Sequence, residues 1–508
     1  MRFQPRILTL RNNFDSLLAA LAGAVFIYIL TSYHGIGMSP DSVSYTGVAR
    51  NLTQGRWFTD YDDTPIIIFP VGYPTFLGII SKISFKDVLI IAPWINAFLI
   101  GLVIFINGCI MERFHERSWW HKWAILSILP ISFSLLDVYT MLWSETLFMV
   151  FLCFFIVYIK KYLSTPTLLN LLLPSLFTSL ACDTRIAGIS ILGTGLFLIL
   201  IQKKLPWLNK LFHLIVFLAF GIAILLANLI RNQQESGTTT GERLKSITPL
   251  IKNIQYFGDT LLQWLQLPNA APFVAVSLGI TIILVFGVVF LYRYFTKDKI
   301  SSFEIINITF CIVYVFFIIL TSTISRYEKI NNRLLAPAFI PFLLGISFYI
   351  PILIRSLKTR LLRIIVVAIV AVIFFSFQYQ QTKAAFALHD EFRENGIPGY
   401  NELGWQESDI VRFLKDKKAF FKPGIDIYSN AADAVYFYNG FPALTLPEPP
   451  NKKDLQEYLE SDPNYIIIFT NDFNNPAIIR LNDIAKFRQL DTLVKLNDGI
   501  ILWSKQRK

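Results

Sequence analysis

Charged residues are scarce in this sequence, and so are cysteine and histidine. Only 16% of the 508 residues are Asp, Glu, Lys or Arg, whereas 54% are hydrophobic and the mean hydropathy is +0.51. So few charges cannot cover the surface of an ordinary soluble globule. The composition therefore indicates a polytopic membrane protein.

The sequence also lacks several motifs that are typical of other classes of enzyme. The four cysteines fall in or beside apolar segments, so neither a disulfide framework nor a thiolate metal site is indicated. The sequence has no Gly-rich nucleotide loop, no zinc-type histidine pattern and no nucleophile elbow. The net charge of +11 is concentrated in the apolar half of the chain, which does not favour a nucleic-acid partner.

Long apolar segments dominate the first three quarters of the chain. We expect about eleven transmembrane helices, at residues 15–33, 87–111, 123–138, 143–160, 167–182, 186–202, 211–230, 272–292, 303–323, 334–354 and 364–379. The predicted fold class is therefore an α-helical polytopic membrane protein with a small extracytoplasmic α/β domain. We place the transmembrane domain at residues 1–379 and the α/β domain at residues 380–508.

The distribution of Lys and Arg predicts the orientation, because short cytoplasmic loops accumulate these residues. With a cytoplasmic N-terminus, the inner segments hold 18 Lys and Arg in 60 residues, and the outer segments hold 12 in 116. The C-terminal domain is then extracytoplasmic. We expect a multi-pass protein of the plasma (inner) membrane that contacts membrane lipids.

The tail has alternating strand and helix patterns. Strand-like runs occupy residues 424–430, 464–470, 490–496 and 499–505, and helical patterns occupy 407–420, 452–461 and 476–487. This arrangement predicts a small α/β domain.

The loop at residues 34–86 is too long for a simple connection and contains "SPDSVSYTGVARNLTQG" and "PIIIFPVGYPTFLGII". Ser39 suits an N-cap, Pro40 the first helical position, and Asp41 the positive end of a helix. We expect a first interfacial helix here, lying along the membrane surface on one apolar face, and a second one at residues 73–84.

Ionisable residues of both signs fall at the outer membrane surface. Such groups are costly at this depth unless they are paired or hydrated, so their convergence predicts a site. The residues are Asp41, Glu145, Asp183, Arg185, Arg231, Arg326 and Arg333.

Asp41 and Glu145 are the predicted catalytic residues. Asp41 is placed to act as a general base that takes a proton from an acceptor hydroxyl or amine. Its structural alternative is an acid that only stabilises the start of a helix. Glu145 is the second carboxylate, with a first-turn helix acid as its structural alternative, and Asp137 competes for the same role.

Five further residues are predicted to bind substrate. The arginines would hold a lipid phosphate and stabilise charge on a phosphate leaving group; otherwise they anchor helix ends at lipid head groups. Two tyrosines lie on the short helices of the first loop, where the alternatives are an interfacial aromatic and a rigid turn. These residues are Arg185, Arg326, Arg333, Tyr45 and Tyr73.

The order of "SPDSVSYTGVARNL", "PVGYP", "WSETLF", "CDTRIAG" and "NRLLAPAFIP" resembles the GT-C membrane glycosyltransferases. The similarity is to the bacterial branch of protein mannosyltransferases and lipid A aminoarabinose transferase, and it covers about residues 15–355. The resemblance implies a polyprenyl-phosphate-linked sugar donor. It also implies transfer to a lipid, glycan or protein acceptor on the non-cytoplasmic face, with inversion at the anomeric carbon.

Residue by residue, the resemblance assigns Asp41 to the family's acidic catalytic position and Glu145 to its second acidic position. Arg333 matches a donor-phosphate residue, and Arg185 matches a basic residue after the fifth span. The first loop lacks the tight acidic pair of the family, because its other aspartates come 19 or more residues later. The family's divalent cation is therefore left open, and no metal ligands are predicted.

Two other functions compete with this prediction. A lipid-linked-sugar flippase or transporter would use the same arginines on a phosphate head group, but it should carry charges deep inside its spans, and these spans are nearly free of them. An O-antigen-ligase-like enzyme should have a large late outer loop with His and Arg. The segment "SRYEKINNR" is short and lacks His.

Overall fold

The computed structural model describes residues 13–114, 118–241, 243–296, 300–449, 452–470 and 478–507. Contacts divide the chain into two compact units. The first, here called the helical unit, contains Met1–Ser32, Ile67–Tyr73 and Ala92–Asp390. The second, the loop-tail unit, contains Tyr33–Ile66, Pro74–Ile91 and Glu391–Lys508. The division into a transmembrane domain at residues 1–379 and an α/β domain at residues 380–508 stays a prediction.

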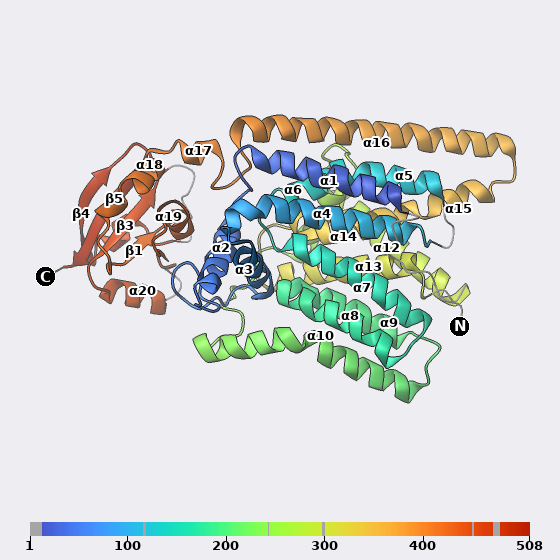
Figure 1. Ribbon diagram of the computed structural model, residues 1–508, viewed down its shortest axis with the longest axis horizontal. Coiled ribbons are helices and arrows are strands. Elements are labelled where there is room, and N and C mark those ends of the chain that lie inside the picture. The colour runs from blue at the N-terminus through green and yellow to red at the C-terminus, as the bar shows by residue number, and fades with distance from the viewer. Residues whose placement is uncertain are drawn as a thin grey trace. The chain divides into compact units, whose positions relative to one another are not determined.

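Long helices make up the helical unit (Figure 1). In chain order they are α1 (Phe14–Ser32), α4 (Val88–Met111), α5 (Trp119–Ile128), α6 (Phe133–Tyr139), α7 (Glu145–Ser164), α8 (Leu168–Thr184), α9 (Ile189–Leu200), α10 (Trp207–Ser236), α11 (Leu250–Trp264), α12 (Pro272–Thr296), α13 (Phe303–Ile324), α14 (Asn332–Ser347), α15 (Tyr349–Ser356) and α16 (Arg360–Asn395).

Within the described residues, eight helices are long and apolar enough to cross a membrane. The α5 and α6 pair forms a ninth candidate, bent by 42° at a short 3₁₀ turn that contains Pro130. The shorter apolar helices α8 and α9 complete the set. Each of the eleven predicted spans thus corresponds to a helix or a broken helix.

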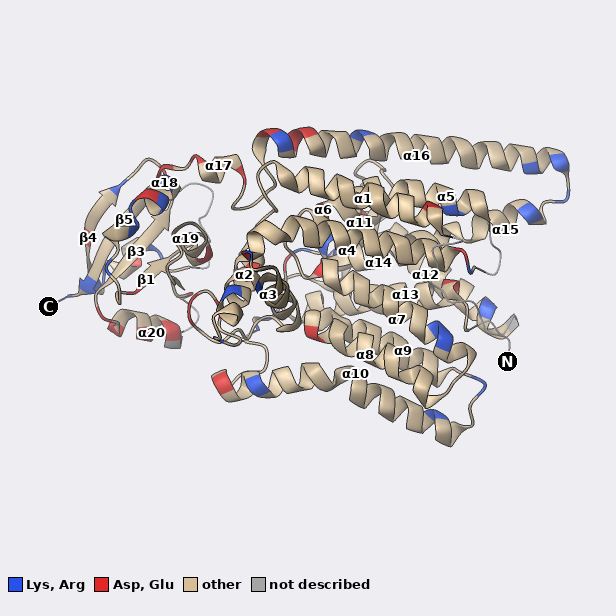
Figure 2. Ribbon diagram, in the orientation of Figure 1, with Lys and Arg blue, Asp and Glu red and all other residues tan. Residues whose placement is uncertain are grey.

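The exposed surface of these helices is apolar, which indicates that lipid surrounds them. The apolar window of α16 has no buried residues, and that of α12 is only 22% buried. Figure 2 shows the middle sections of the helices largely free of Lys, Arg, Asp and Glu, which gather toward the helix ends. So much exposed apolar surface requires lipid around it. The protein is an integral membrane protein.

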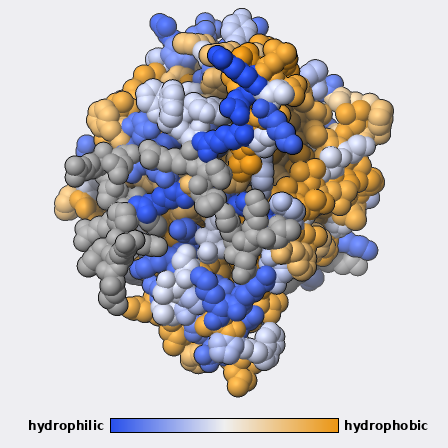
Figure 3. Space-filling view, turned by 90° about the vertical axis from the view of Figure 1, so that its right-hand side faces the viewer, coloured by the Kyte–Doolittle hydropathy of each residue, from blue (hydrophilic) through white to orange (hydrophobic). Residues whose placement is uncertain are grey.

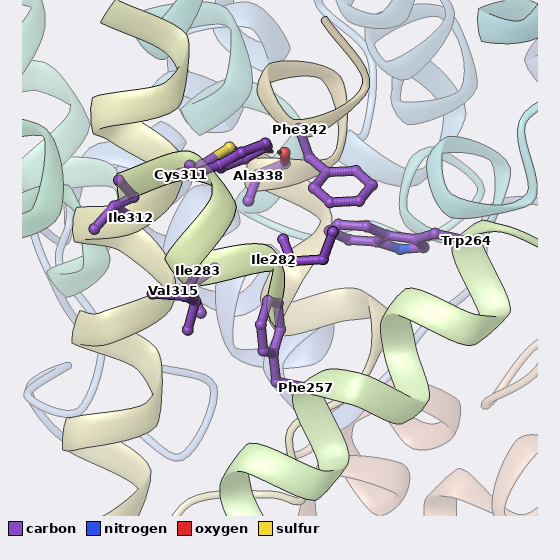
Figure 4. A pocket seen from close by; sticks show the side chains of 10 residues that line it. Phe257, Trp264, Ile282, Ile283, Cys311, Ile312, Val315, Ala338 and Phe342 are labelled. Carbon is purple, nitrogen blue, oxygen red and sulfur yellow. Dashed lines mark hydrogen bonds between the residues drawn. The ribbon is translucent and has the colours of Figure 1, made fainter. Parts of the chain in front are cut away.

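Helix α11 is absent from the predicted elements, since it lies in the connection between the predicted spans at 211–230 and 272–292. Its Asn253, Phe257, Leu261 and Trp264 are buried at spacings of three and four residues, as on one face of a helix. Together with α12, α13 and α14, this helix encloses an apolar pocket lined by the Phe257 and Trp264 rings (Figure 4).

A five-stranded mixed sheet forms the centre of the tail, with strand order β2-β1-β3-β5-β4. Strands β1 (Ile427–Ser429), β2 (Leu444–Thr445) and β3 (Asn464–Phe469) are parallel. Strands β4 (Arg488–Lys495) and β5 (Gly499–Gln506) run antiparallel to their neighbours. The four predicted strand-like runs are confirmed, and the short strand β2 was not predicted.

Helices of the tail surround this sheet. They are α17 (Leu403–Gln406), α18 (Asp409–Asp416), α19 (Ala432–Asn439), α20 (Lys452–Glu460) and α21 (Leu481–Ile484). The helical pattern at 407–420 corresponds to α18, and that at 452–461 to α20. The pattern at 476–487 lies partly outside the described residues. Helix α19 was not predicted.

The first loop forms the two predicted short helices, α2 (Pro40–Thr53) and α3 (Gly72–Ser84). Ser39 caps α2 in a reciprocal box with Ser42, as the Ser39-Pro40 start predicts. The expectation that α2 rests on a single apolar face is wrong. Every residue from Ser42 to Ala49 is buried, because α3, α19 and the chain around Tyr61 cover this helix.

Backbone contacts tie the start of the loop to the tail within the loop-tail unit. The Tyr400 amide donates to the Met38 carbonyl at 2.9 Å, and the Asn401 side chain donates to the Ile36 carbonyl at 2.6 Å. Gly399 permits this approach. Its φ is +107°, and a Cβ on it would lie 2.1 Å from the Met38 carbonyl oxygen.

We expect Gly399→Ala to loosen the segment before α2, because the methyl group collides with the Met38 carbonyl and the residue is strained at positive φ. Amide hydrogen exchange of residues 36–53 should rise at least tenfold. Gly404→Ala is the matched control, since a Cβ there meets nothing within 4 Å. Unchanged exchange in Gly399→Ala would show that this contact does not hold the loop.

Candidate active site

One buried glutamate joins two arginines in the helical unit. Glu145 is the first residue of α7, and its side chain is 0% exposed. The Arg185 Nη1 atom lies 2.5 Å from Glu145 Oε2, and Arg333 Nε donates to Glu145 Oε1 at 2.9 Å. A carboxylate at this depth requires such partners, because burying an uncompensated charge costs several kcal/mol.

Arg185 reaches Glu145 from the sharp turn between α8 and α9. Its backbone is extended, with φ −152° and ψ 141°, and a short 3₁₀ helix follows. Gly188 makes this turn possible, since a Cβ on it would lie 2.4 Å from the Cys182 nitrogen. Arg185 Nη1 also donates to Ser144 Oγ at 3.0 Å, so one guanidinium nitrogen contacts both Glu145 and Ser144.

Arg333 is oriented by its position near the start of α14. Asn331 caps this helix, with its side chain accepting from the Leu334 amide. The guanidinium carbon lies 4.1 Å from the centre of the Trp143 ring, a cation–π contact. Glu328 adds a longer ion pair at 3.7 Å. The planar donor group of Arg333 is therefore fixed before any substrate arrives.

Asn332, which the sequence reasoning missed, connects this cluster to a second acid. The Asn332 side-chain amide donates to Asp137 Oδ2 at 2.7 Å, and the Trp264 indole donates to Asn332 Oδ1 at 2.8 Å. Consecutive residues of α14 thus bind Asp137 and Glu145. The sequence signal for Asn332 was the pair of asparagines directly before Arg333. The contact between Trp264 and Asn332 could not be predicted, because Trp264 lies on helix α11, which was not predicted.

The "PVGYP" segment meets the end of α8 in the same unit. A Cβ on Gly72 would lie 2.6 Å from the Asp183 carbonyl oxygen and 2.7 Å from its Oδ2. Only glycine fits this approach. Arg231 lies within electrostatic reach of Asp183, and the neighbouring Asn232 donates to the Ile67 carbonyl at 3.1 Å. Predicted residues from three distant segments therefore meet here.

Asp41 lies in the loop-tail unit, at the second helical position of α2. Asp433, on α19, is within electrostatic reach of it. The Tyr400 hydroxyl donates to Asp433 Oδ2 at 2.5 Å. Burial raises the pKa of Asp433, the Tyr400 hydrogen bond opposes this shift, and the charge of Asp41 adds to it. The tail thus contributes a second carboxylate near Asp41.

A third acid of the loop-tail unit lies next to α2. Asp60 accepts a hydrogen bond from Ser44, which is three residues after Asp41 and so on a neighbouring part of the same helix face. Burial raises the pKa of Asp60 to about 6, although Ser44 and the Tyr61 amide donate to it. Asp60 thus titrates near neutral pH.

We expect the stability of the loop-tail unit to fall as pH rises. The pKa of Asp60 is higher in the folded chain than the ordinary 3.8, so its contribution is full below that value and is lost as pH rises through about 6. The loss between pH 5 and pH 7.5 is about 1 to 2 kcal/mol. Thermal unfolding of the wild type and Asp60→Asn at both pH values measures it.

Asp60→Asn should flatten this dependence, because the amide does not titrate. Asp63→Asn is the control, since Asp63 is half exposed and pairs with Arg56. An equal pH slope in the wild type and Asp60→Asn would show that Asp60 does not carry the effect.

Three other predicted residues are placed differently. Tyr45 is buried in α2, at 3% exposure, and Tyr73 is buried in the helical unit, at 0%. Arg326 is exposed, and its backbone amide pairs with the Leu244 carbonyl. Within the described residues, no ion pair or side-chain hydrogen bond joins Arg326 to Glu145. Its substrate-binding role stays a prediction.

The implied divalent cation finds no ready donor set. Across the described ranges, no group of three or more His, Cys, Asp or Glu side chains is arranged to hold a metal ion. Asp41 and Asp433 interact as separate carboxylates, without a third acid in ligating geometry. No step is therefore assigned to a cation below.

No protein-family model matches the sequence, and no curated protein matches it. Solved structures do match its fold. ArnT from Cupriavidus metallidurans, bound to undecaprenyl phosphate, superposes with a TM-score of 0.58 at 10% identity, over 96% of this chain and 97% of that one.

The apo state of ArnT gives a TM-score of 0.57 at 11% identity, with the same coverage. The archaeal oligosaccharyltransferase AglB from Archaeoglobus fulgidus, in complex with an inhibitory peptide and a dolichol-phosphate, gives 0.53 at 11% identity. That match covers 91% of this chain and 69% of the other. This chain thus shares the architecture of these proteins over most of its length. The protein has the fold of the GT-C membrane glycosyltransferases.

Proposed function

We propose that the protein is a membrane glycosyltransferase that moves a sugar from a polyprenyl-phosphate-linked donor to a lipid, glycan or protein acceptor. Two observations support this proposal together with the fold. A buried carboxylate fixes two arginines in the helical unit, and an aspartate begins a capped, buried helix in the loop-tail unit.

The paired arginines are the observation on which the proposal chiefly rests. Guanidinium groups match phosphate oxygens with paired N–H donors, and the bonds are strengthened by charge. Arg185 and Arg333 come from different helices but converge on Glu145. We assign both to the donor phosphate. Because Glu145 and Trp143 already orient Arg333, little reorganisation opposes phosphate binding.

The reaction is written as a single displacement with inversion. The acceptor oxygen or nitrogen attacks the anomeric carbon as the bond between that carbon and the phosphate oxygen breaks. Asp41 takes the proton of the acceptor, and the polyprenyl phosphate leaves with the bonding electrons. The arginines stabilise the charge that develops on the phosphate.

Glu145 acts in this scheme by positioning the arginines. Both of its carboxylate oxygens face guanidinium groups and its side chain is fully buried, so it is poorly placed to accept a proton from an acceptor. We therefore propose that Glu145 contributes to catalysis by positioning the two arginines and not by transferring a proton.

We propose the inner membrane as the location, with the N-terminus cytoplasmic and the C-terminal domain extracytoplasmic. The density of Lys and Arg in alternate connections supports this orientation. Transfer would then take place on the non-cytoplasmic face, as in the synthesis of a cell-envelope glycan.

Binding of undecaprenyl phosphate to purified protein tests the arginine assignment. We expect Arg333→Ala and Arg185→Ala each to weaken binding at least tenfold, because a charge-assisted pair is lost. Arg363→Ala is the control, since that arginine is exposed on α16. Unchanged affinity in both cluster variants would contradict the proposal.

A further inference from the structure

Arg293 is a buried arginine outside the candidate active site, and two of its nitrogens lack a hydrogen-bond partner within the described residues. Arg293, one turn before the end of α12, is only 4% exposed. Its Nε and Nη2 atoms are buried and have no hydrogen-bond partner in the part of the chain that the structure describes. A buried donor without a hydrogen-bond partner is costly, and more so when it is charged, so these two atoms call for a partner outside the part of the chain that the structure describes.

The two unsatisfied atoms define the shape of that partner. Nε–H and one Nη2–H lie on the same edge of the guanidinium plane and point in nearly the same direction. This edge is the one that binds two oxygens of a phosphate or carboxylate side by side. The guanidinium carbon lies 5.7 Å from the centre of the Phe348 ring, a cation–π contact that helps to hold the plane in place.

The surroundings add another polar group. The Tyr349 hydroxyl lies within electrostatic reach of Arg293, and it is also buried without a hydrogen-bond partner among described residues. Tyrosine can donate to the oxygen of an anion. Two side chains from different helices, α12 and α15, thus offer donors in the same region.

An internal ion pair is the competing explanation. Glu304 is buried at 1% exposure, and Tyr349 is within electrostatic reach of both Glu304 and Arg293. Glu304 nevertheless has an interaction of its own. Among the described residues, no ion pair or hydrogen bond joins Glu304 to the Arg293 Nε and Nη2 atoms.

This region is distant from the candidate active site. Lys160 lies 5.2 Å from the Phe303 ring, next to Glu304, and is within electrostatic reach of that glutamate. Lys160 follows Glu145 by fifteen residues on α7, which corresponds to about 22 Å along the helix axis. Arg293 and the Glu145 cluster therefore lie toward opposite ends of the helical unit.

The surface of α12 indicates what kind of anion would fit. Its Val288, Leu291 and Phe295 side chains are 64%, 51% and 74% exposed. Figure 3 shows hydrophobic and hydrophilic side chains next to one another on one face of the molecule. Apolar chains can pack on α12 while a phosphate reaches Arg293, a combination that a phospholipid supplies.

We propose that Arg293 binds the phosphate of a phospholipid head group, with Tyr349 as a second donor. The site is separate from the donor site and does not depend on the glycosyltransferase proposal. In the predicted orientation it belongs to the cytoplasmic leaflet.

Native mass spectrometry of detergent-purified protein tests the site. We expect the wild type to retain phospholipid and Arg293→Gln to retain at least tenfold less. Arg363→Gln, an exposed arginine of α16, should behave as the wild type. Arg293→Lys keeps the charge but loses the paired donors, so it should retain less lipid than the wild type while still folding.

Two further experiments distinguish a phospholipid from free phosphate and from an internal ion pair with Glu304. Added phosphatidylglycerol should raise the melting temperature of the wild type but not of Arg293→Gln, and inorganic phosphate should not. A shift with inorganic phosphate alone would overturn the lipid assignment. If Glu304→Gln lowers stability as much as Arg293→Gln while lipid retention is unchanged in both, the arginine serves an internal pair and the proposal is wrong.

Discussion

Asp41→Asn should reduce sugar transfer by about 10²- to 10⁴-fold, the usual contribution of a positioned general base. The amide keeps the size and the first-turn position of the side chain but cannot take the acceptor proton. The Ser39 and Ser42 capping box of α2 does not involve Asp41, so the helix should still form. Turnover and donor binding, measured on the same preparations, separate catalysis from folding.

Donor affinity should remain unchanged in Asp41→Asn, because the donor phosphate is assigned to Arg185 and Arg333 and not to Asp41. Asp63→Asn, an exposed aspartate of the same loop, should retain full turnover. Turnover within twofold of the wild type in Asp41→Asn would rule out Asp41 as the base.

Glu145→Gln should destabilise the protein by about 3–5 kcal/mol, because removing one partner of a buried ion pair leaves charge uncompensated. Here two guanidinium groups would lose the carboxylate that holds them. The amide is nearly the same size, so packing changes little. A melting curve in detergent measures the loss.

Undecaprenyl phosphate should restore part of the stability of Glu145→Gln, since a bound phosphate supplies the negative charge that the arginines lack. The melting temperature should therefore rise more with ligand in the variant than in the wild type. A large destabilisation without recovery would indicate that the arginines serve the fold alone. A variant as stable as the wild type would contradict the central role of Glu145.

The transmembrane helices could be predicted from the sequence because lipid exposure demands long apolar runs. The capped start of α2 was also predictable, since Ser39 and Pro40 act locally. For Glu145, Arg185 and Arg333, the sequence predicted only that all three lie at the same depth in the membrane. Their actual contacts depend on how α7, α8 and α14 pack.

The missed features have tertiary causes. Helix α11 carries Lys, Asn, Gln and Asp, so its average hydropathy does not distinguish it from a polar loop, and only its buried face does. Helix α19 follows a short strand and has eight residues, too few for a clear period. The burial of α2 on all sides was unpredictable, because part of its cover comes from residues almost 400 positions later.

Transfer of radiolabel from a panel of polyprenyl-phosphate sugars by purified protein in liposomes tests the proposed glycosyltransferase activity most directly. An extract of lipids, glycans and proteins serves as the acceptor, and Arg333→Ala is assayed in parallel. We expect labelled product from a donor in the panel, formed by the wild type and strongly reduced in Arg333→Ala. Movement of the labelled lipid between leaflets without any product would contradict the proposed activity and favour a flippase.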